Sequence, residues 1–469
     1  MGLYFRFCGR FYYRRLSVKR ENNFTEGRIF APLITFALPV LLALLLQTAY
    51  GAADLLIVGK FGGDLSDVYQ SAVSTGSQIM QTLTLVITGL SMGVTVFVGE
   101  MIGAKMSDKA GKIIGNGIFL FGVLAVILTV VMTSAAPLLA GLMKSPAEAY
   151  DETVAYIVIC SAGTLFITAY NLVGSIFRGI GDSKMPLITV MIACVLNILG
   201  DLLLVAVFHM GAKGTAFATV FSQAISVALS LIIIRKRSLP FSFSLKDIRP
   251  QKIYIKSILK LGTPVALQDL LANFSFLAIL AIINNIGLTE SASVGVAEKL
   301  CGFIMLVPSA FMQSMSSFVA QNMGAKKPER ARKALLCGIV SSLAVGVVMF
   351  YFTFFHGELL SGLFAEKPET VFGAAEYLKA YAIDCIFTSF LFCFMGYFNG
   401  CGRTTFVMLQ GVICAFGIRI PISWLMSKQT PVSLFHIGLA IPASTIVQII
   451  ICVSFFFVML RQQKRETVQ

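Results

Sequence analysis

Among the acidic side chains inside the long apolar stretches of the sequence, the clearest candidates for chemistry are Asp54, Asp201, Asp269 and Asp384. An ionisable group near the middle of a membrane costs about 2.5–3.5 kcal/mol on insertion scales, so each is a candidate for function. Tyr50 lies four residues before Asp54 and Asn197 lies four before Asp201, which puts each pair on one face of a helix. Two carboxylates, an amide and a phenol at similar depth would suit a hard cation such as sodium, at Asp54, Asn197 and Asp201, or a proton.

The same residues are also compatible with a buried hydrogen-bonded network that only ties helices together, and the residues alone leave both readings open. No cofactor is indicated. The ten cysteines form no CxxC pair and the three histidines are far apart in the sequence, so neither a zinc site nor a disulfide framework is supported. The phosphate-binding GxxxxGK[ST] pattern is absent, and nothing has the spacing of an enzyme's catalytic site.

Asp384 and Arg419 fall near the middle of two consecutive apolar stretches. Because an unpaired arginine there would be costly and consecutive helices are often neighbours, we expect the two side chains to pair. The alternative is that Asp384 attracts a cationic substrate. Near the outer end of the eighth stretch, Glu298 and Lys299 are expected to form a solvated interfacial pair.

The composition indicates an integral membrane protein of the all-α class. Hydrophobic residues make up 57% of the 469 residues and charged residues 13%, too few to cover the surface of a soluble domain. Apolar runs long enough to span a membrane as helices occur twelve times, at 31–58, 72–101, 115–140, 153–177, 186–208, 214–234, 255–286, 294–322, 335–355, 373–398, 405–426 and 435–460.

The net charge of +14 is unevenly distributed. Most basic residues fall in the terminal segments and the even-numbered connections; few fall in the odd-numbered ones, at Lys60, Lys144, Lys213, Lys367 and Lys428. Lysine and arginine are retained on the cytoplasmic side, so both termini are expected there. Because the charges flank apolar spans, the expected partner is membrane lipid and not nucleic acid.

An internal repeat divides the chain into halves. Phe, Val, Gly, Ala and Lys recur between 97–105 and 318–326, an offset of 221 residues, and the same offset relates the glycines of 179–181 and 400–402. Six spans per half give a parallel repeat about an axis along the membrane normal, which suits alternating access. The expected divisions are a basic cytoplasmic segment 1–30, an N-lobe 31–234, a basic linker 235–254, a C-lobe 255–460 and a tail 461–469.

In the order of its motifs, the chain resembles the bacterial branch of the multidrug and toxic compound extrusion (MATE) family. The matching stretches are QTAYGAAD at 47–54, VGEMIGA at 98–104, RGIGD at 178–182, NILGD at 197–201, VAQNMGA at 319–325 and NGCGR at 399–403. The resemblance implies a twelve-helix, two-lobe exporter of amphipathic organic cations in a bacterial inner membrane. It also implies a monomer that is coupled to inward flow of protons or sodium.

By this resemblance, Tyr50, Asp54, Asn197 and Asp201, with Thr219 on the sixth span, match the family's coupling-ion site. The C-lobe departs from the sodium-coupled branch, which has a carboxylate about eight residues after the proline of the seventh span. Here Ala272 and Asn273 follow Pro264 at that distance, and Asp269 falls on another face. The alternative function is a flippase for lipid-linked oligosaccharides, although carboxylates within the spans do not suit a pyrophosphate ligand.

Overall fold

The computed structural model describes residues 24–236 and 239–468, all of whose regular elements are helices. The rest of the expected basic amino-terminal segment, two linker residues and the last residue of the tail lie outside the described residues. Eleven helical spans are long and apolar enough to cross a membrane, and a bent pair makes a twelfth. This agrees with the twelve spans expected from the sequence.

The first six spans form the N-lobe. Its helices are α1 Phe30–Phe61, α2 Ser66–Gly103, α3 Ser107–Leu142, α4 Tyr150–Ala162, α5 Thr164–Ile180, α6 Lys184–Asp201 and α7 Gly211–Lys236, with a short 3-10 helix η1 Gly63–Leu65 before α2. The fourth span is broken: α4 and α5 meet at an angle of 52° around Gly163. The fifth continues beyond α6 as a π-helix, η2 Leu202–Val207.

The last six spans form the C-lobe, which begins after a linker containing the 3-10 helix η3 Leu245–Asp247. Its helices are α8 Lys252–Asn284, α9 Leu288–Ile304, α10 Leu306–Gly324, α11 Pro328–Phe355, α12 Gly357–Ser361, α13 Pro368–Gly400, α14 Thr404–Cys414, α15 Ile420–Ser427, α16 Leu434–Gly438 and α17 Ala440–Val468. Between α14 and α15 lies a second π-helix, η4 Ala415–Arg419. Each lobe thus carries a π-helix in its fifth span.

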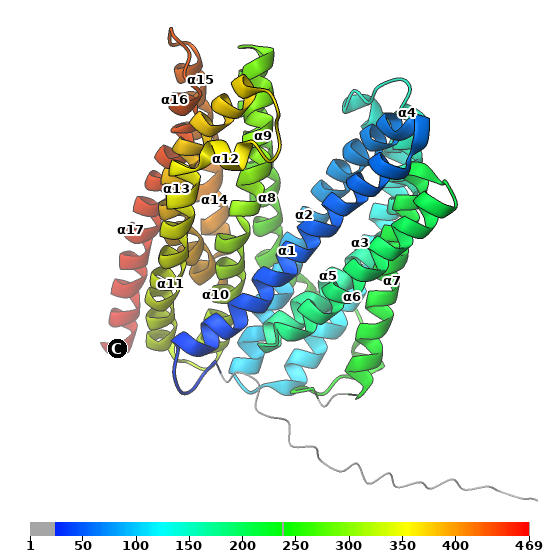
Figure 1. The fold of residues 1–469 in the computed structure, drawn as a ribbon. Helices are drawn as coiled ribbons and strands as arrows, with labels where there is room; N and C mark the ends of the chain where they lie inside the picture. Colours follow the sequence, from blue (N-terminus) through cyan, green and yellow to red (C-terminus); the bar gives the residue numbers. More distant parts are fainter. Residues whose placement is uncertain (1–23, 237–238, 469) are drawn as a thin grey trace, which may run out of the picture.

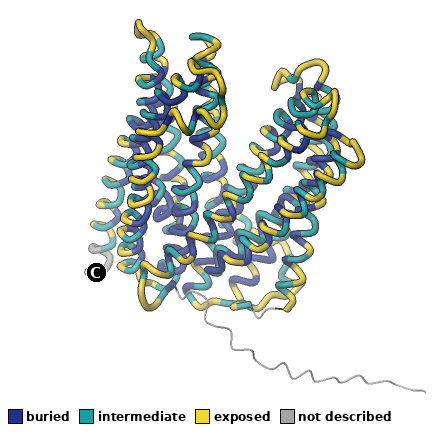
Figure 2. Tube along the Cα trace, viewed as in Figure 1, coloured by how far each residue is buried: buried dark blue, intermediate teal, exposed yellow. Residues whose placement is uncertain are grey.

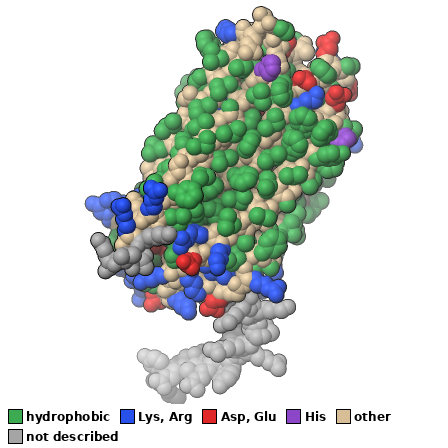
Figure 3. Space-filling model, turned by 90° about the vertical axis from the view of Figure 1, so that its left-hand side faces the viewer, with side chains coloured by type: hydrophobic (Ala, Val, Ile, Leu, Met, Phe, Trp, Pro, Cys, Tyr) green, Lys and Arg blue, Asp and Glu red, His purple; other side chains and the backbone are tan. Residues whose placement is uncertain are grey.

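The two lobes meet at one end of the molecule and diverge towards the other (Figure 1). Buried residues concentrate where helices pack against one another, and exposed ones on the outer surfaces (Figure 2). Lysine and arginine side chains gather around the end where the lobes meet, and hydrophobic side chains cover most of the face above it (Figure 3). We call this the basic end. The even-numbered connections lie there, which matches the charge pattern of the sequence.

At the basic end, α2 and α10 cross with their backbones in close contact. A Cβ atom added at Gly103 would overlap the carbonyl oxygen of Gln321, and one added at Gly324 would overlap that of Glu100. These two contacts exchange under the 221-residue offset, so they are equivalent under the repeat. Lys105 and Lys326, at another equivalent position, both have positive φ (59° and 56°). The repeat seen in the sequence is therefore a repeat of backbone structure.

A short segment before α1 also fastens the lobes at the basic end. The Phe24 ring is fully buried between Phe36 of α1 and Phe318 of α10, with ring centroids 5.2 and 4.9 Å away. Arg330 of α11 donates hydrogen bonds to four carbonyl oxygens of this segment, including that of Phe24 at 2.8 Å. The Gln321 amide donates to the carbonyl oxygen of Gly179 in the N-lobe at 2.9 Å.

The linker between the lobes is fixed to α3. The Gln251 backbone N–H donates to Asn116 Oδ1 at 2.7 Å, and the Ser242 hydroxyl donates to Asp108 at 2.6 Å. The linker backbone also lies so close to α3 that no side chain would fit at Gly111 or Gly115. The described part of the linker is therefore a structured element of the N-lobe.

Candidate functional site

The N-lobe brings two carboxylates together. Asp54 lies towards the carboxyl-terminal end of α1 and is 5% exposed, and Asp201 is the last residue of α6 and is fully buried. The Asp54 carboxyl lies within hydrogen-bonding reach of that of Asp201, because α1 packs along α6. The π-helix η2 begins directly after Asp201. Wider helical turns of this kind occur often at functional sites.

Two neutral polar side chains complete this cluster. Asn197 lies one turn before Asp201 on α6, is 1% exposed, and its amide Nδ2 donates to the Thr219 hydroxyl of α7 at 3.3 Å. Both side chains are also within hydrogen-bonding reach of Asp54. Four of the five predicted coupling residues therefore surround one point where α1, α6 and α7 meet.

Most oxygen atoms facing this point have no hydrogen-bond donor. Among the residues that the structure describes, none donates to Asp54 Oδ1, Asn197 Oδ1 or either carboxylate oxygen of Asp201. Buried polar atoms are nearly always paired, and an unpaired one costs about 1–3 kcal/mol. Two carboxylates that face each other without donors repel when both are ionised. A proton or a small cation between them would satisfy the oxygens and remove the repulsion.

Tyr50, the fifth predicted residue, lies beside the cluster rather than in it. Its hydroxyl lies near Gln223 of α7, and the carboxylates are further away. Gln223 was not identified from the sequence, although it stands four residues after Thr219 and so shares a helical face with it. Gln47 of α1 donates to the Tyr170 hydroxyl at 3.1 Å, which extends the polar contacts of α1 towards α5.

Tyr156 and Cys160 of α4 lie near the carboxylate pair on another side and were also not predicted. Both are almost completely buried, at 3% and 2% exposure. They belong to α4, the shorter half of the fourth span, which is bent by 52° against α5 around Gly163. No residue pattern in the sequence marks this bend beyond the glycine itself.

In the C-lobe, the expected ion pair between Asp384 and Arg419 is not formed as a direct contact. Among the described residues no salt bridge joins them, although their charges are close enough to attract each other. Arg419 Nη1 instead donates to Ser275 Oγ at 3.2 Å, and its guanidinium lies 4.7 Å from the centroid of the Phe276 ring. Asp384 is 1% exposed on α13, and its side chain lies beside Thr445 of α17. The reason is the arrangement of the helices, because the span containing Arg419 packs mainly against α8, whereas Asp384 lies on α13.

The other two C-lobe acids remain separate. Asp269 is half-buried on α8 and forms no salt bridge within the described part of the chain. The expected pair of Glu298 with Lys299 is not formed. Glu298 is half-buried, its Oε1 has no donor among the described residues, and it lies near Tyr377, whereas Lys299 is exposed. No group of three or more His, Cys, Asp or Glu side chains suited to a metal ion occurs in the described residues.

The fold, a repeated six-span bundle with a carboxylate pair inside one lobe, is that of a multi-pass membrane transporter. The sequence profile of the MatE family matches residues 39–203 and 264–425, one segment in each lobe. The chain belongs to this family, the multidrug and toxic compound extrusion transporters. Its members are transporters rather than enzymes.

Individual relatives match the chain along nearly all its length. It is 22% identical to a probable multidrug resistance protein, YoeA, of Bacillus subtilis over 92% of this chain and 95% of the relative. It is 24% identical to the multidrug export protein MepA of Staphylococcus saprophyticus, covering 86% and 88% of the two chains. A structure described as an outward-facing multidrug resistance MATE transporter superposes with a TM-score of 0.88 at 19% identity, covering 95% and 99%.

Proposed function

We propose that this protein exports amphipathic organic cations from a bacterial cell in exchange for protons or sodium ions. Asp54 and Asp201 bind the incoming ion, and Asn197 and Thr219 complete its surroundings. The single observation that carries this proposal is the set of buried oxygen atoms without donors at the meeting point of α1, α6 and α7. A purely structural network would be expected to satisfy these atoms within the protein.

The α1 helix is suited to transmit the state of this site. Its carboxyl-terminal half holds Asp54 against α6, whereas its amino-terminal half packs against α10 of the other lobe and carries Phe36 next to Phe24. Pro39 interrupts the helical hydrogen bonding between these two halves. Occupation of the carboxylate pair changes how α1 packs, and this change reaches the contact between the lobes.

The contacts at the basic end correspond to a state closed on that side. In the proposed orientation this end faces the cytoplasm, because basic residues are retained there during insertion. Ion entry from outside then releases the drug outward, and ion release inward accompanies binding of new drug. Each ligand must bind the two states with different affinity for this exchange to occur.

The proposal is tested by ethidium efflux from loaded vesicles under a pH gradient and, separately, a sodium gradient. We expect Asp54→Asn and Asp201→Asn each to lower gradient-driven efflux by about tenfold or more, within the range of typical coupling free energies. Asp64→Asn is the matched control, because Asp64 is an exposed aspartate in η1. Comparison of the two gradients identifies the coupling ion.

Normal efflux by both variants at the N-lobe pair would refute this assignment of the coupling site. The alternative function, a flippase for lipid-linked oligosaccharides, would be favoured by a different result. The unmodified protein would then move no ethidium, and a lipid pyrophosphate would compete with ethidium for binding to it.

A further inference from the structure

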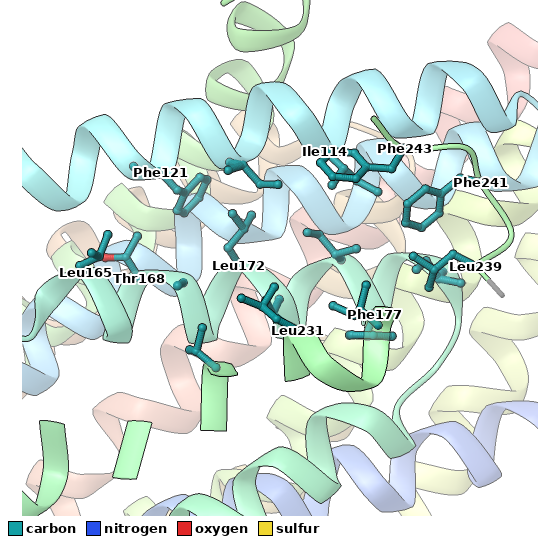
Figure 4. Close-up of a pocket in the computed structure, with 18 residues that line it drawn as sticks. Ile114, Phe121, Leu165, Thr168, Leu172, Phe177, Leu231, Leu239, Phe241 and Phe243 are labelled. Atoms are coloured by element: carbon teal, nitrogen blue, oxygen red, sulfur yellow. The ribbon is translucent and has the colours of Figure 1, made fainter. Parts of the chain in front are cut away.

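An apolar groove lies on the side of the N-lobe, away from the carboxylate pair. Its residues come from α3, α5, α7 and the linker, and it encloses about 1010 Å³ including its open side. Figure 4 shows side chains from these elements pointing into the groove, among them Phe121, Leu172 and Leu231. Thr168 is the one polar side chain among the 18 that line it. The groove therefore suits a hydrocarbon chain better than a polar ligand.

The internal repeat provides a comparison for this groove. Under the 221-residue offset, small or aliphatic residues of α5 correspond to aromatic residues of α13: Ala169 to Phe390, Val173 to Phe394 and Ile176 to Tyr397. In the C-lobe these aromatic side chains pack together with the Phe456 ring of α17, which lies 6.0 Å from that of Phe394 and 5.6 Å from that of Tyr397. The smaller side chains of α5 leave room for the groove at the corresponding positions of the N-lobe.

Positive charge marks the end of the groove nearest the basic end. Arg235 and Lys236 follow directly after the lining residue Ile234 in the last turn of α7. Both are exposed, and neither has a salt-bridge partner among the described residues. Leu239 and Phe241 of the linker line the groove beside them. Further along, the linker is held against α3 by the hydrogen bonds of Ser242 and Gln251.

We propose that the groove binds an anionic phospholipid. One acyl chain lies between α3 and α7 over α5, and the headgroup phosphate contacts Arg235, which stands four residues after the lining residue Leu231 and so shares its face of α7. The order of the elements along the groove supports this arrangement: apolar lining within the membrane-spanning helices, then a cation without a salt-bridge partner among the described residues at the end of α7. A phospholipid has a matching arrangement, because an apolar acyl chain is followed by a charged headgroup. Basic residues at the cytoplasmic surface attract anionic headgroups.

The test compares lipids retained by the purified full-length protein. The protein is washed in detergent, incubated with phosphatidylglycerol or phosphatidylcholine, and analysed by native mass spectrometry. We expect retention of about one phosphatidylglycerol per chain and weaker retention of phosphatidylcholine. The variant Ala169→Phe/Val173→Phe fills the groove with the residues of the C-lobe. Loss of contact with two methylene groups already corresponds to about a tenfold loss of affinity.

The matched control is Val131→Phe/Leu138→Phe, because these residues are 53% and 65% exposed on α3 and do not line the groove. This variant should retain phosphatidylglycerol like the unmodified protein. Gly122→Leu provides a second way to obstruct the groove, since a Cβ at Gly122 meets no atom within 4 Å and folding should be unaffected. Arg235→Gln should abolish the preference for phosphatidylglycerol over phosphatidylcholine while leaving the acyl-chain site intact.

Equal retention of phosphatidylglycerol by the unmodified, Ala169→Phe/Val173→Phe and Gly122→Leu proteins would overturn the proposed site. Equal retention of the two lipids by the unmodified protein would overturn the role of the headgroup. Displacement of the lipid by ethidium, with loss of ethidium binding in the Gly122→Leu variant, would show that the groove takes a transported drug and not a lipid.

Discussion

The close crossing of α2 and α10 predicts that a single methyl group will shift the balance between the two states of the transporter. In Gly324→Ala, the new Cβ would overlap the carbonyl oxygen of Glu100, which belongs to the backbone of the other lobe. A backbone atom in a helix cannot move aside as a flexible side chain would. The lobes must therefore separate slightly, which disfavours the state closed at the basic end and leaves the open state unaffected.

The size of the effect follows from the cost of overpacking. Extra methyl groups in well-packed contacts destabilise by about 1–3 kcal/mol. Because this cost falls on one state only, it changes the ratio of closed to open molecules by roughly 5- to 150-fold. Gly103→Ala should behave in the same way, since Gly103 makes the equivalent contact with the carbonyl oxygen of Gln321.

Spin labels at Lys112→Cys and Lys333→Cys provide the measurement, in a background without the native cysteines. Both lysines are exposed near the basic end, one on α3 and one on α11, and they are equivalent under the repeat. Double electron–electron resonance should show one short distance for the parent protein. Gly324→Ala should add or enlarge a population at longer distance.

The matched control is Gly302→Ala, which lies in the same span as Gly324 but whose Cβ would meet no atom within 4 Å. Its distance distribution should equal that of the parent. An unchanged distance distribution for both Gly324→Ala and Gly103→Ala would show that the contact between α2 and α10 accommodates a methyl group without destabilising the closed state. That result would refute the prediction.

Three further outcomes are expected. Phe24→Ala removes a fully buried ring and should lower the midpoint of thermal unfolding, because such truncations cost about 3–5 kcal/mol in packed cores. Its control, Phe30→Ala, changes a residue that is 56% exposed and should alter the midpoint little. Arg330→Gln should speed proteolytic cleavage within residues 24–29, since it removes charged donors to four carbonyl oxygens; an unchanged cleavage rate would contradict this. Arg419→Lys should destabilise the C-lobe almost as much as Arg419→Met, judged by thermal unfolding, because a lysine reproduces neither the guanidinium over Phe276 nor its hydrogen bond to Ser275; full stability of the lysine variant would argue against this contact.

The sequence predicted span positions and helix faces well, because apolar length and four-residue spacing are local properties. Asp54 and Asp201 could be assigned similar depth from their places in α1 and α6, and the structure brings them together. The offset between 97–105 and 318–326 likewise predicted equivalent backbone contacts, which the crossing of α2 and α10 displays.

What the sequence could not provide was the choice of neighbouring helices. Asp384 and Arg419 share a similar depth, but Arg419 faces Ser275 on α8 because its span packs against that helix. Depth is set by hydropathy along one chain segment, whereas helix neighbours depend on the packing of the whole bundle. The break at Gly163 and the π-helices were not predicted for the same reason, and with them the approach of Tyr156 to the carboxylates was missed.

The attachment of the linker to α3 restricts how the two lobes can move. Because Ser242 and Gln251 are bound to α3, the linker from Ser242 to Gln251 is held against the N-lobe up to the start of α8. The first turns of α8 then pack closely on α2, where a Cβ at Gly93 would overlap the carbonyl oxygen of Ile258 and one at Gly262 would overlap that of Leu90. This part of the connection leaves no slack, so a rocking motion of the lobes has to shift the contact between α2 and α8.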